Sequence, residues 1–222
     1  MLPVHRLSSR RIRIGAVAAL STAALVAPAA AQAGAVAVDR PCYTEGDQVT
    51  LGGTGFSPGS TVSISGDGFY GSAPVLANGA FVYQGSAPLQ SASKPGSKMV
   101  PITVTDSAGV TSSTSVRVAP LAMRVKPSRG NPRKRVTWSF SGFPQGSTIY
   151  GHFSRGGRTF SHRFGQAQGA CGTLSTRARL LPIASHRVRY GVYRGQIDTR
   201  PTLVSGTLPR LEFSLQIFKI YR

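Results

Sequence analysis

Residues 49–62, VTLGGTGFSPGSTV, recur in altered form at residues 136–149, VTWSFSGFPQGSTI. The two stretches align without a gap at an offset of 87, with Val, Thr, Gly, Phe, Gly, Ser and Thr at matching positions. A period near 90 residues is longer than a solenoid repeat and close to the size of one immunoglobulin-like sandwich. The repeat therefore predicts two related domains in tandem, at residues 34–119 and 120–222.

The segments around the repeat have the composition of β-strands. Short runs rich in Val, Thr, Ile and aromatic residues are broken by Gly, Pro, Asn and Asp, and no window after residue 33 keeps a helical apolar period. Asp67-Gly68 and Asn78-Gly79 are typical two-residue hairpin turns. We therefore expect an all-β fold of two sandwiches. The predicted strands are residues 48–53, 60–65, 99–105, 110–118, 122–127, 134–141, 147–154, 158–165, 174–183, 187–194 and 211–221.

Two further stretches resemble a known family. DRPCYTEGDQVTLGGTGFSPGSTVSI (residues 39–64) resembles the opening of bacterial Ig-like repeats, including IPT/TIG-type domains, and ITVTDSAGVTSSTSVRV (residues 102–118) resembles their end. Residues 120–222 resemble a divergent copy. The resemblance implies a β-sandwich in an exported or surface protein that acts as a spacer or binding module. It carries over no catalytic residue, and a fold alone does not choose a function.

The first 33 residues have the pattern of an export signal. Four arginines precede an apolar run at residues 15–27, and Ala31-Gln32-Ala33 forms an A-x-A cleavage site. The apolar run is shorter than the roughly 20 residues of a transmembrane helix. A general secretory signal is favoured over a twin-arginine signal, because Arg13 stands where the latter carries an apolar residue. We expect a secreted chain, with association to the cell envelope as a possibility and no transmembrane segment after cleavage.

Charge is concentrated in the second half of the chain. Residues 34–119 carry four Lys and Arg against five Asp and Glu, whereas residues 120–222 carry 18 Lys and Arg against Asp198 and Glu212. This asymmetry favours an anionic partner for the second half. The alternative is a solvated basic surface without a dedicated ligand, since a high net charge also keeps a protein soluble.

The two cysteines, Cys42 and Cys171, lie in the exported part, where disulfides persist. They do not occupy matching positions in the two copies, which excludes a bridge within one domain. A bridge between the halves would close a loop of 129 residues and would contribute roughly 4–5 kcal/mol. Free thiols and an intermolecular link remain alternatives. No C-x-x-C spacing suggests zinc, and we expect no metal or cofactor.

The segment GFSPG, residues 55–59, matches the Gly-x-Ser-x-Gly pattern of a hydrolase nucleophile elbow, with Ser57 as nucleophile. Pro58 follows it, however, and has no N–H for an oxyanion hole. The second copy, GFPQG, carries Pro144 in place of the serine. We therefore interpret GFSPG as a turn and expect no catalytic residue.

His152 and His162 lie in the segment STIYGHFSRGGRTFSHRFG, which predicts one hairpin turning at Gly156-Gly157. In that register His152 faces Ser161, and His162 lies among phenylalanines on the opposite side of the sheet. We expect one packed and one surface histidine and no shared metal. Asp198 and Glu212 are each expected to pair with a neighbouring arginine. No nucleophile, base and orienting acid can be assembled from the sequence, which argues against an enzyme.

The basic residues of the second half are the best functional candidates. The sequence RGNPRKR precedes a strand, two arginines flank the hairpin tip, and two pairs alternate along predicted strands, so several could share a face. The candidates for binding a polyanion are Arg129, Arg133, Lys134, Arg135, Arg155, Arg158, Arg163, Arg177, Arg179, Arg187 and Arg189. Tyr150, Tyr190 and Tyr193 lie among them and could stack on sugars or bases.

These features predict a non-enzymatic protein whose cationic second half associates with anionic envelope polymers or lipids. Such binding would depend strongly on salt. Nucleic acid is the less expected polyanion outside the cell. The alternative is an adhesin- or inhibitor-type module that binds another surface protein through sandwich loops.

Overall fold

The computed structural model describes residues 34–89, 94–128 and 130–218. The export signal predicted at residues 1–33 lies outside them. The described residues form strands and one short 3-10 helix, at Ser185–Arg187. The strands are β1 (Ala35–Val38), β2 (Tyr43–Thr44), β3 (Gln48–Thr54), β4 (Thr61–Gly66), β5 (Phe69–Pro74), β6 (Phe81–Ser86), β7 (Lys98–Asp106), β8 (Thr111–Ala119), β9 (Ala122–Lys126), β10 (Arg135–Ser141), β11 (Thr148–Arg155), β12 (Arg158–Gln166), β13 (Leu174–Arg179), β14 (Gly191–Asp198) and β15 (Leu211–Ile217). The predicted all-β fold is confirmed.

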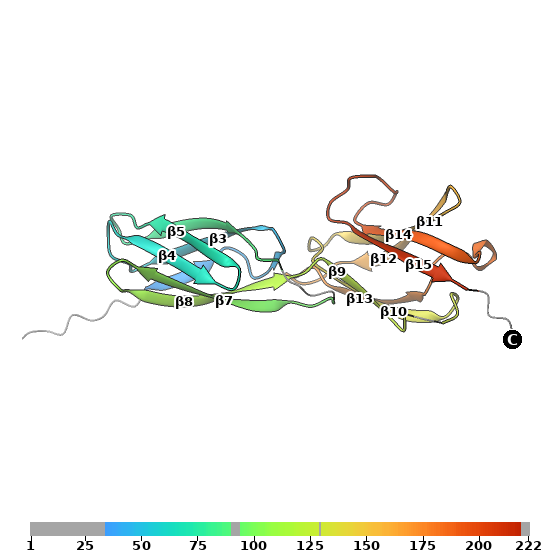
Figure 1. Cartoon of the computed structure of the whole chain (residues 1–222), viewed down its shortest axis with the longest axis horizontal. Coiled ribbons are helices and arrows are strands. Elements are labelled where there is room, and N and C mark those ends of the chain that lie inside the picture. The colour runs from blue at the N-terminus through green and yellow to red at the C-terminus, as the bar shows by residue number, and fades with distance from the viewer. Residues whose placement is uncertain (1–33, 90–93, 129, 219–222) are drawn as a thin grey trace, which may run out of the picture. The chain divides into compact units, whose positions relative to one another are not determined.

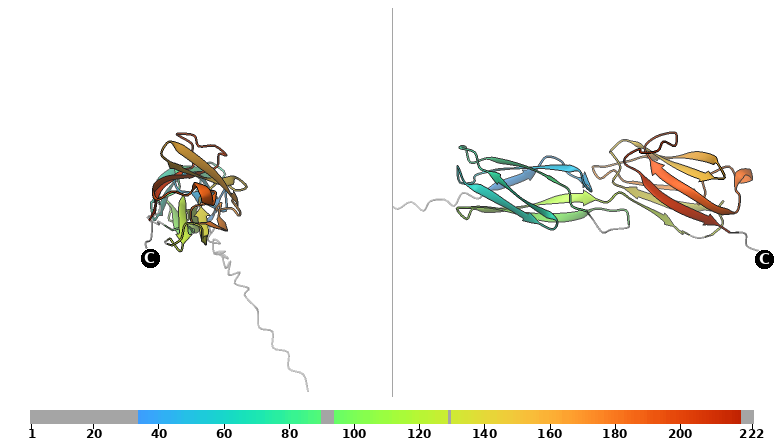
Figure 2. Two further views of the ribbon diagram at one scale, coloured as in Figure 1. Left: turned by 90° about the vertical axis from the view of Figure 1, so that its right-hand side faces the viewer. Right: turned by 45° about the horizontal axis from the view of Figure 1, so that its top comes forward.

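The strands form four sheets. The first two have the orders β1-β3-β6 and β2-β8-β7-β4-β5, and the last two have the orders β9-β10-β13 and β12-β11-β14-β15. In Figures 1 and 2 the strands of residues 35–119 (blue to green) and of residues 122–217 (yellow-green to red) form separate groups. Alternation of buried and exposed residues along each strand turns one face of every sheet toward an apolar core.

Each pair of sheets encloses its own core. The first core contains Tyr43, Phe56, Phe69 and Phe81 with a layer of Val, Leu and Ile from the surrounding strands. The second is built around Trp138, whose ring contacts Phe140, Phe153, Phe164 and Phe213. Trp138 is wholly buried, and its indole N–H donates to the carbonyl of Arg179 at 3.1 Å. This bond satisfies the polar end of a large apolar side chain.

The internal repeat of the sequence is also a repeat of structure. At the offset of 87 residues the bounds of β3 coincide with those of β10. The GFSPG and GFPQG turns match as well: the amide of Ser60 donates to Ser57 O, the amide of Ser147 donates to Pro144 O, and each distance is 3.1 Å. The strand order is repeated as well. The sheet β1-β3-β6 corresponds to β9-β10-β13, and β5-β4-β7-β8 corresponds to β12-β11-β14-β15.

Three local predictions were wrong. Asn78-Gly79 forms a turn but no hairpin, because β5 and β6 belong to different sheets. β13 ends at Arg179, since the next residues turn away with Leu181 in the core. β14 begins only at Gly191, after the 3-10 helix at Ser185–Arg187.

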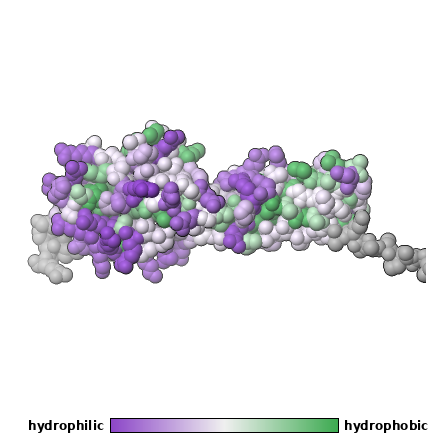
Figure 3. Space-filling view, turned by 180° about the vertical axis from the view of Figure 1, so that it is seen from behind, coloured by the Kyte–Doolittle hydropathy of each residue, from purple (hydrophilic) through white to green (hydrophobic). Residues whose placement is uncertain are grey.

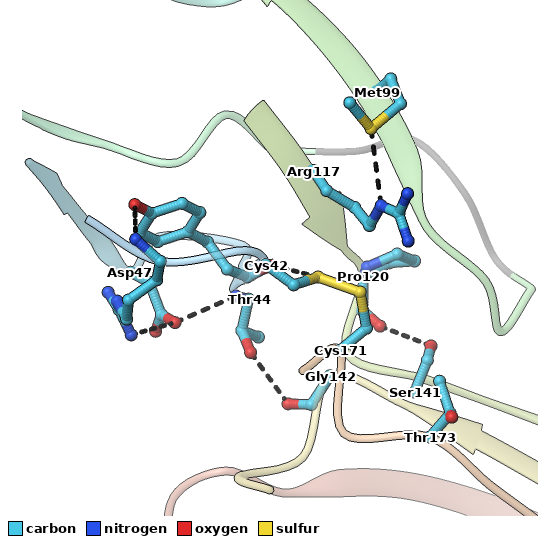
Figure 4. The surroundings of a disulfide bond; sticks show 12 residues. Cys42, Thr44, Asp47, Met99, Arg117, Pro120, Ser141, Gly142, Cys171 and Thr173 are labelled. Atoms are coloured by element: carbon cyan, nitrogen blue, oxygen red, sulfur yellow. Dashed lines mark hydrogen bonds and ion pairs between the residues drawn. A yellow bond between two sulfur atoms is a disulfide. The ribbon is translucent and has the colours of Figure 1, made fainter. Parts of the chain in front are cut away.

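Cys42 and Cys171 form a disulfide (Figure 4), and their Cα atoms lie 5.3 Å apart. Near the bridge, the hydroxyl of Thr44 donates to the carbonyl of Gly142 at 3.2 Å, and the hydroxyl of Ser141 donates to Pro120 O at 2.7 Å. The bridge predicted between the two halves is thus confirmed, and the free-thiol alternative is excluded.

Candidate functional site

The outer side of the sheet β9-β10-β13 carries a cluster of cations. Side chains alternate along each strand, so that Val136, Trp138 and Phe140 point into the core and their neighbours point outward. Five basic residues point outward and are exposed, and we call this surface the basic face: Arg124, Lys126, Arg135, Arg177 and Arg179.

The strand register places these cations side by side. Arg135 lies opposite Arg179, while Lys126 and Arg177 lie on either side of Thr137. None of the three strands contains an acidic residue. Like charges directly opposite each other on a sheet destabilise it. An anion bound to this face would relieve that repulsion.

Sequence reasoning found part of the basic face and missed part of it. It singled out Arg135, Arg177 and Arg179, whose shared exposure is confirmed. It missed Arg124 and Lys126, although their two-residue spacing in AMRVK would place both on one side of an edge strand. Of the other candidates, Arg133 and Lys134 are exposed in the loop before β10, and Arg129 lies outside the described residues.

Four more of the predicted arginines surround a cavity of about 390 Å³ at one end of the sheet β12-β11-β14-β15. We call it the arginine-lined cavity, and its lining residues are Arg155, Arg158, Phe160, His186, Arg187, Arg189 and Tyr193. The prediction that Arg187 and Arg189 alternate on a strand was wrong, because both precede β14. Arg163 is exposed on β12, opposite Tyr150.

The three tyrosines have different environments. Tyr193 is only 1% exposed, and its hydroxyl accepts a hydrogen bond from the amide of Arg189 at 2.9 Å. It packs in the core and cannot stack on a ligand, so this prediction was wrong. Tyr150 is half-buried, whereas Tyr190 is 56% exposed and remains available.

The hairpin of β11 and β12 has the predicted register, with His152 opposite Ser161 and Gly151 opposite His162. The burial of the two histidines was predicted the wrong way round. His152 is fully buried, because the loop at residues 199–210 covers that side of the sheet and supplies Arg200 O as a partner. His162 is half-buried against Phe164 at 4.9 Å between ring centroids, and burial lowers the pKa of its imidazole.

His152 links a serine to an aspartate, which sequence reasoning had excluded. Its Nε2 lies 3.2 Å from Oδ1 of Asp198 and 3.1 Å from Arg200 O, and its Nδ1 lies 2.8 Å from Oγ of Ser161. Both partners of Nε2 are acceptors, so Nε2 carries a proton, and Nδ1 makes its hydrogen bond with the hydroxyl of Ser161. Asp198, also fully buried, accepts further bonds from the amide of Arg200 and the side chain of Gln196.

This arrangement has the connectivity of a Ser-His-Asp triad, but its imidazole is not accessible to a substrate. In a hydrolase the imidazole must pass a proton from the serine to the leaving group, so it must reach the substrate. His152 contributes to the lining of a cavity of about 570 Å³ but has no solvent-accessible surface. The network instead holds the loop against the sheet, helped by the bond from Gln196 to Val204 O at 3.3 Å.

The remaining acidic side chains have structural partners. Glu212 pairs with Arg210 at 3.4 Å, as predicted, whereas Asp198 makes its contacts with His152, Gln196 and a backbone amide, so its predicted pairing with an arginine was wrong. Asp106 accepts the amide of Ser57 at 2.9 Å, and hydrogen bonds from Ser57 hold the pKa of its carboxyl below the usual value of 3.8.

Within residues 34–89, 94–128 and 130–218, no three His, Cys, Asp or Glu side chains gather closely enough to hold a metal ion. The same residues include no helix with the length and apolar character needed to span a membrane. On the face shown in Figure 3, hydrophilic side chains are densest at the left, over the C-terminal half of the chain. The clustered cations form two candidate binding sites, the basic face and the arginine-lined cavity.

No protein-family model and no curated protein matches this chain. Among solved structures, it is similar to a tetra-tandem repeat from the extending region of a large adhesion protein, with 16% identity, a TM-score of 0.29, and coverage of 83% of this chain and 48% of that one. It is also similar to the Ca²⁺-stabilised adhesin with which an Antarctic bacterium binds ice, with 16% identity, a TM-score of 0.29, and coverage of 84% and 49%. A third similar structure is the Escherichia coli adhesin FdeC, with 13% identity, a TM-score of 0.38, and coverage of 85% of this chain and 65% of that one. The chain spans less than two thirds of each of these structures, and scores this low assign it no activity.

Proposed function

We propose that this chain is an exported, non-enzymatic protein whose cationic second half associates with anionic polymers or lipids of the cell envelope. The proposal comprises a signal peptide at residues 1–33 and two immunoglobulin-like domains at residues 34–119 and 120–222. The separate cores and the repeated strand order support the division into domains. The Cys42–Cys171 disulfide supports export, since such bonds persist in oxidising compartments.

The basic face is the observation that carries the proposed function. Five cations project from three adjacent strands that contain no carboxylate. A polymer with regularly spaced negative charges could neutralise them together and release its counterions, and this release makes binding weaken steeply as salt rises. The first half, with four basic and five acidic residues, would act as a spacer or as a protein-binding module.

The test is retention of the protein on isolated envelopes and on immobilised polyphosphate over a range of salt concentrations. The triple variant Arg124→Gln/Lys126→Gln/Arg177→Gln removes cations whose side chains have no hydrogen-bond or ionic partner in the described part of the chain. We expect it to elute at lower salt and to reduce the slope of log affinity against log salt by about 2–3.

A matched control removes the same charge elsewhere: Arg163→Gln/Arg194→Gln/Arg200→Gln, on β12, on β14 and in the loop after β14. Equal effects of the two triple variants would mean that the basic face has no special role and that binding reflects only the overall positive charge of the chain. Retention that is insensitive to salt, or capture of a single envelope protein, would favour the alternative of an adhesin- or inhibitor-type module. Absence of any retention would refute both.

A further inference from the structure

The arginine-lined cavity brings together four guanidinium groups from separate parts of the sequence. Arg155 ends β11 and Arg158 begins β12, where they face each other across the Gly156-Gly157 turn. Arg187 belongs to the 3-10 helix, and Arg189 lies just before β14. The turn fixes the facing positions of Arg155 and Arg158, because both of its glycines have positive φ, 56° and 74°, as a two-residue hairpin of this type requires.

Two of the four guanidinium groups are held over aromatic rings. Cζ of Arg155 lies 5.7 Å from the centre of the Tyr193 ring, and Cζ of Arg187 lies 5.9 Å from that of Phe160. A cation over a ring face is held there by the ring quadrupole, and its planar fork then keeps its N–H donors free at the edge. Arg187 also donates from Nε to Nε2 of His186 at 3.3 Å. Both groups are therefore oriented before a ligand arrives.

Backbone near the cavity leaves room for this arrangement. Gly191 has a φ of 120°, and a Cβ at this position would lie 3.0 Å from Nη2 of Arg155. A larger residue at the start of β14 would therefore require the guanidinium group of Arg155 to shift by a few tenths of an ångström. Arg155 thus packs closely against the backbone of Gly191.

The cavity has an excess of positive charge without a protein partner. None of the described residues that line it is acidic, and within the described part of the chain its four arginines make no ion pair. Its volume of about 390 Å³ falls within the range of roughly 300–1,000 Å³ of small-molecule sites. Several convergent guanidinium forks match an oxyanion with more than one charged oxygen, and phosphate presents such oxygens in a tetrahedron.

We propose that the arginine-lined cavity is a discrete binding site for a phosphate group, formed by Arg155, Arg158, Arg187 and Arg189. The inference rests on the proposed function for the anionic nature of the partner. It adds a specific site that recognises one phosphate group, whereas the basic face attracts the polymer through its overall charge. The phosphate could belong to a soluble or wall-bound polymer or to a lipid headgroup, and both present the same oxygens.

The first experiment is titration of the full-length mature chain with inorganic phosphate at constant ionic strength, followed by NMR of the arginine Nε–H groups and by calorimetry. We expect saturable binding of one phosphate and shifts in a subset of arginine signals. Arg155→Gln/Arg187→Gln should weaken binding at least tenfold. Arg158→Gln/Arg189→Gln should do the same, and this second pair removes cations with no ring contact, so that loss of folding cannot explain the result.

The matched control is Arg124→Gln/Arg177→Gln, which removes two cations from the basic face. We expect this variant to bind inorganic phosphate as the wild type does and to be weakened in binding to polyphosphate. Equal phosphate affinity in all variants would overturn the inference while leaving the proposed function intact. Normal phosphate binding without any retention on envelopes would refute the proposed function while leaving the phosphate site in place.

Two further probes distinguish the source of the phosphate. Soluble polyphosphate and vesicles of phosphatidylcholine with one-third phosphatidylglycerol are each offered to the wild type and to Arg155→Gln/Arg187→Gln. A selective loss of polyphosphate binding assigns the site to a polymer, and a selective loss of vesicle binding assigns it to a lipid headgroup. If the substitutions affect neither probe beyond the basic-face control, the cavity does not recognise phosphate in either partner and the inference fails.

Discussion

Replacing His152 with alanine should destabilise the second core by about 3–4 kcal/mol. The change removes a donor from the buried carboxylate of Asp198, and a hydrogen bond to a charged group contributes about 1.5–3 kcal/mol. It also leaves Arg200 O without this donor and opens a space where the imidazole had been. The bond to the exposed hydroxyl of Ser161 adds little, because water can replace it.

The chain provides its own probe for this measurement. Trp138 is the only tryptophan and lies fully buried in the second core, so that its emission reports the unfolding of that core. With a urea m-value of roughly 1–3 kcal/mol/M, the expected loss lowers the midpoint by about 1–4 M. Asp198→Asn should also lower the midpoint, because the NH₂ group of the new side chain would face the donors that now bond to the carboxylate. This substitution creates no large cavity, so it tests the hydrogen bonds alone.

His186→Ala is the control, because His186 is exposed and surface substitutions usually change stability by less than about 0.5 kcal/mol. If His152→Ala cost no more than this control, the buried network would not hold the loop at residues 199–210. The same conclusion would follow if Asp198→Asn left the midpoint unchanged.

Three further predictions test other parts of the structure. Cys42→Ala/Cys171→Ala should lower the free energy of complete unfolding by up to about 5 kcal/mol, the chain-entropy value for a loop of 129 residues, and an unchanged urea midpoint would contradict this. Asp106→Asn should destabilise the protein at pH 7, and the difference should shrink as the pH falls below 3.8 through the lowered pKa of Asp106, because the wild type then loses its stabilising carboxylate; a difference that is constant from pH 7 to pH 3 would contradict it. A fluorophosphonate probe should label neither Ser57 nor Ser161, whereas a labelled peptide containing Ser161 would show that His152 acts as a general base after all.

The sequence alone predicted the disulfide and eleven of the fifteen strands in the described part of the chain, because those depend on local patterns and on one pair of residues. Two-residue alternation in RVTWSFS places Trp138 inside and Arg135 outside in the second sandwich. The register of the β11–β12 hairpin followed from its glycine turn in the same way. Sequence reasoning failed where a distant loop decides the outcome.

His152 is the clearest example of that failure. Alternation correctly placed it on the side of the sheet away from the core, and on that ground it was expected at the surface. The loop at residues 199–210 then covers it, and no local pattern around His152 contains that information. The arginine-lined cavity is similar, because it depends on how the 3-10 helix at Ser185–Arg187 approaches the tip of a hairpin some 30 residues earlier.

The two copies place an aspartate at the same point but give it different partners. β7 ends at Asp106 and β14 ends at Asp198, and these strands hold the same place in sheets of matching order. Each carboxylate accepts the amide two residues further on, Ala108 in the first copy and Arg200 in the second. In the first copy it also accepts the amide of Ser57, within GFSPG.

The second copy cannot form that last bond, because Pro144 replaces Ser57 and proline has no N–H. A buried carboxylate that loses a donor must find another or destabilise the fold. Asp198 has two replacements, the imidazole of His152 and the amide of Gln196, and both side chains lie on the outer side of the sheet. The serine in GFSPG is therefore part of how the first copy satisfies a buried aspartate, and the Ser161–His152–Asp198 chain is how the second copy does so.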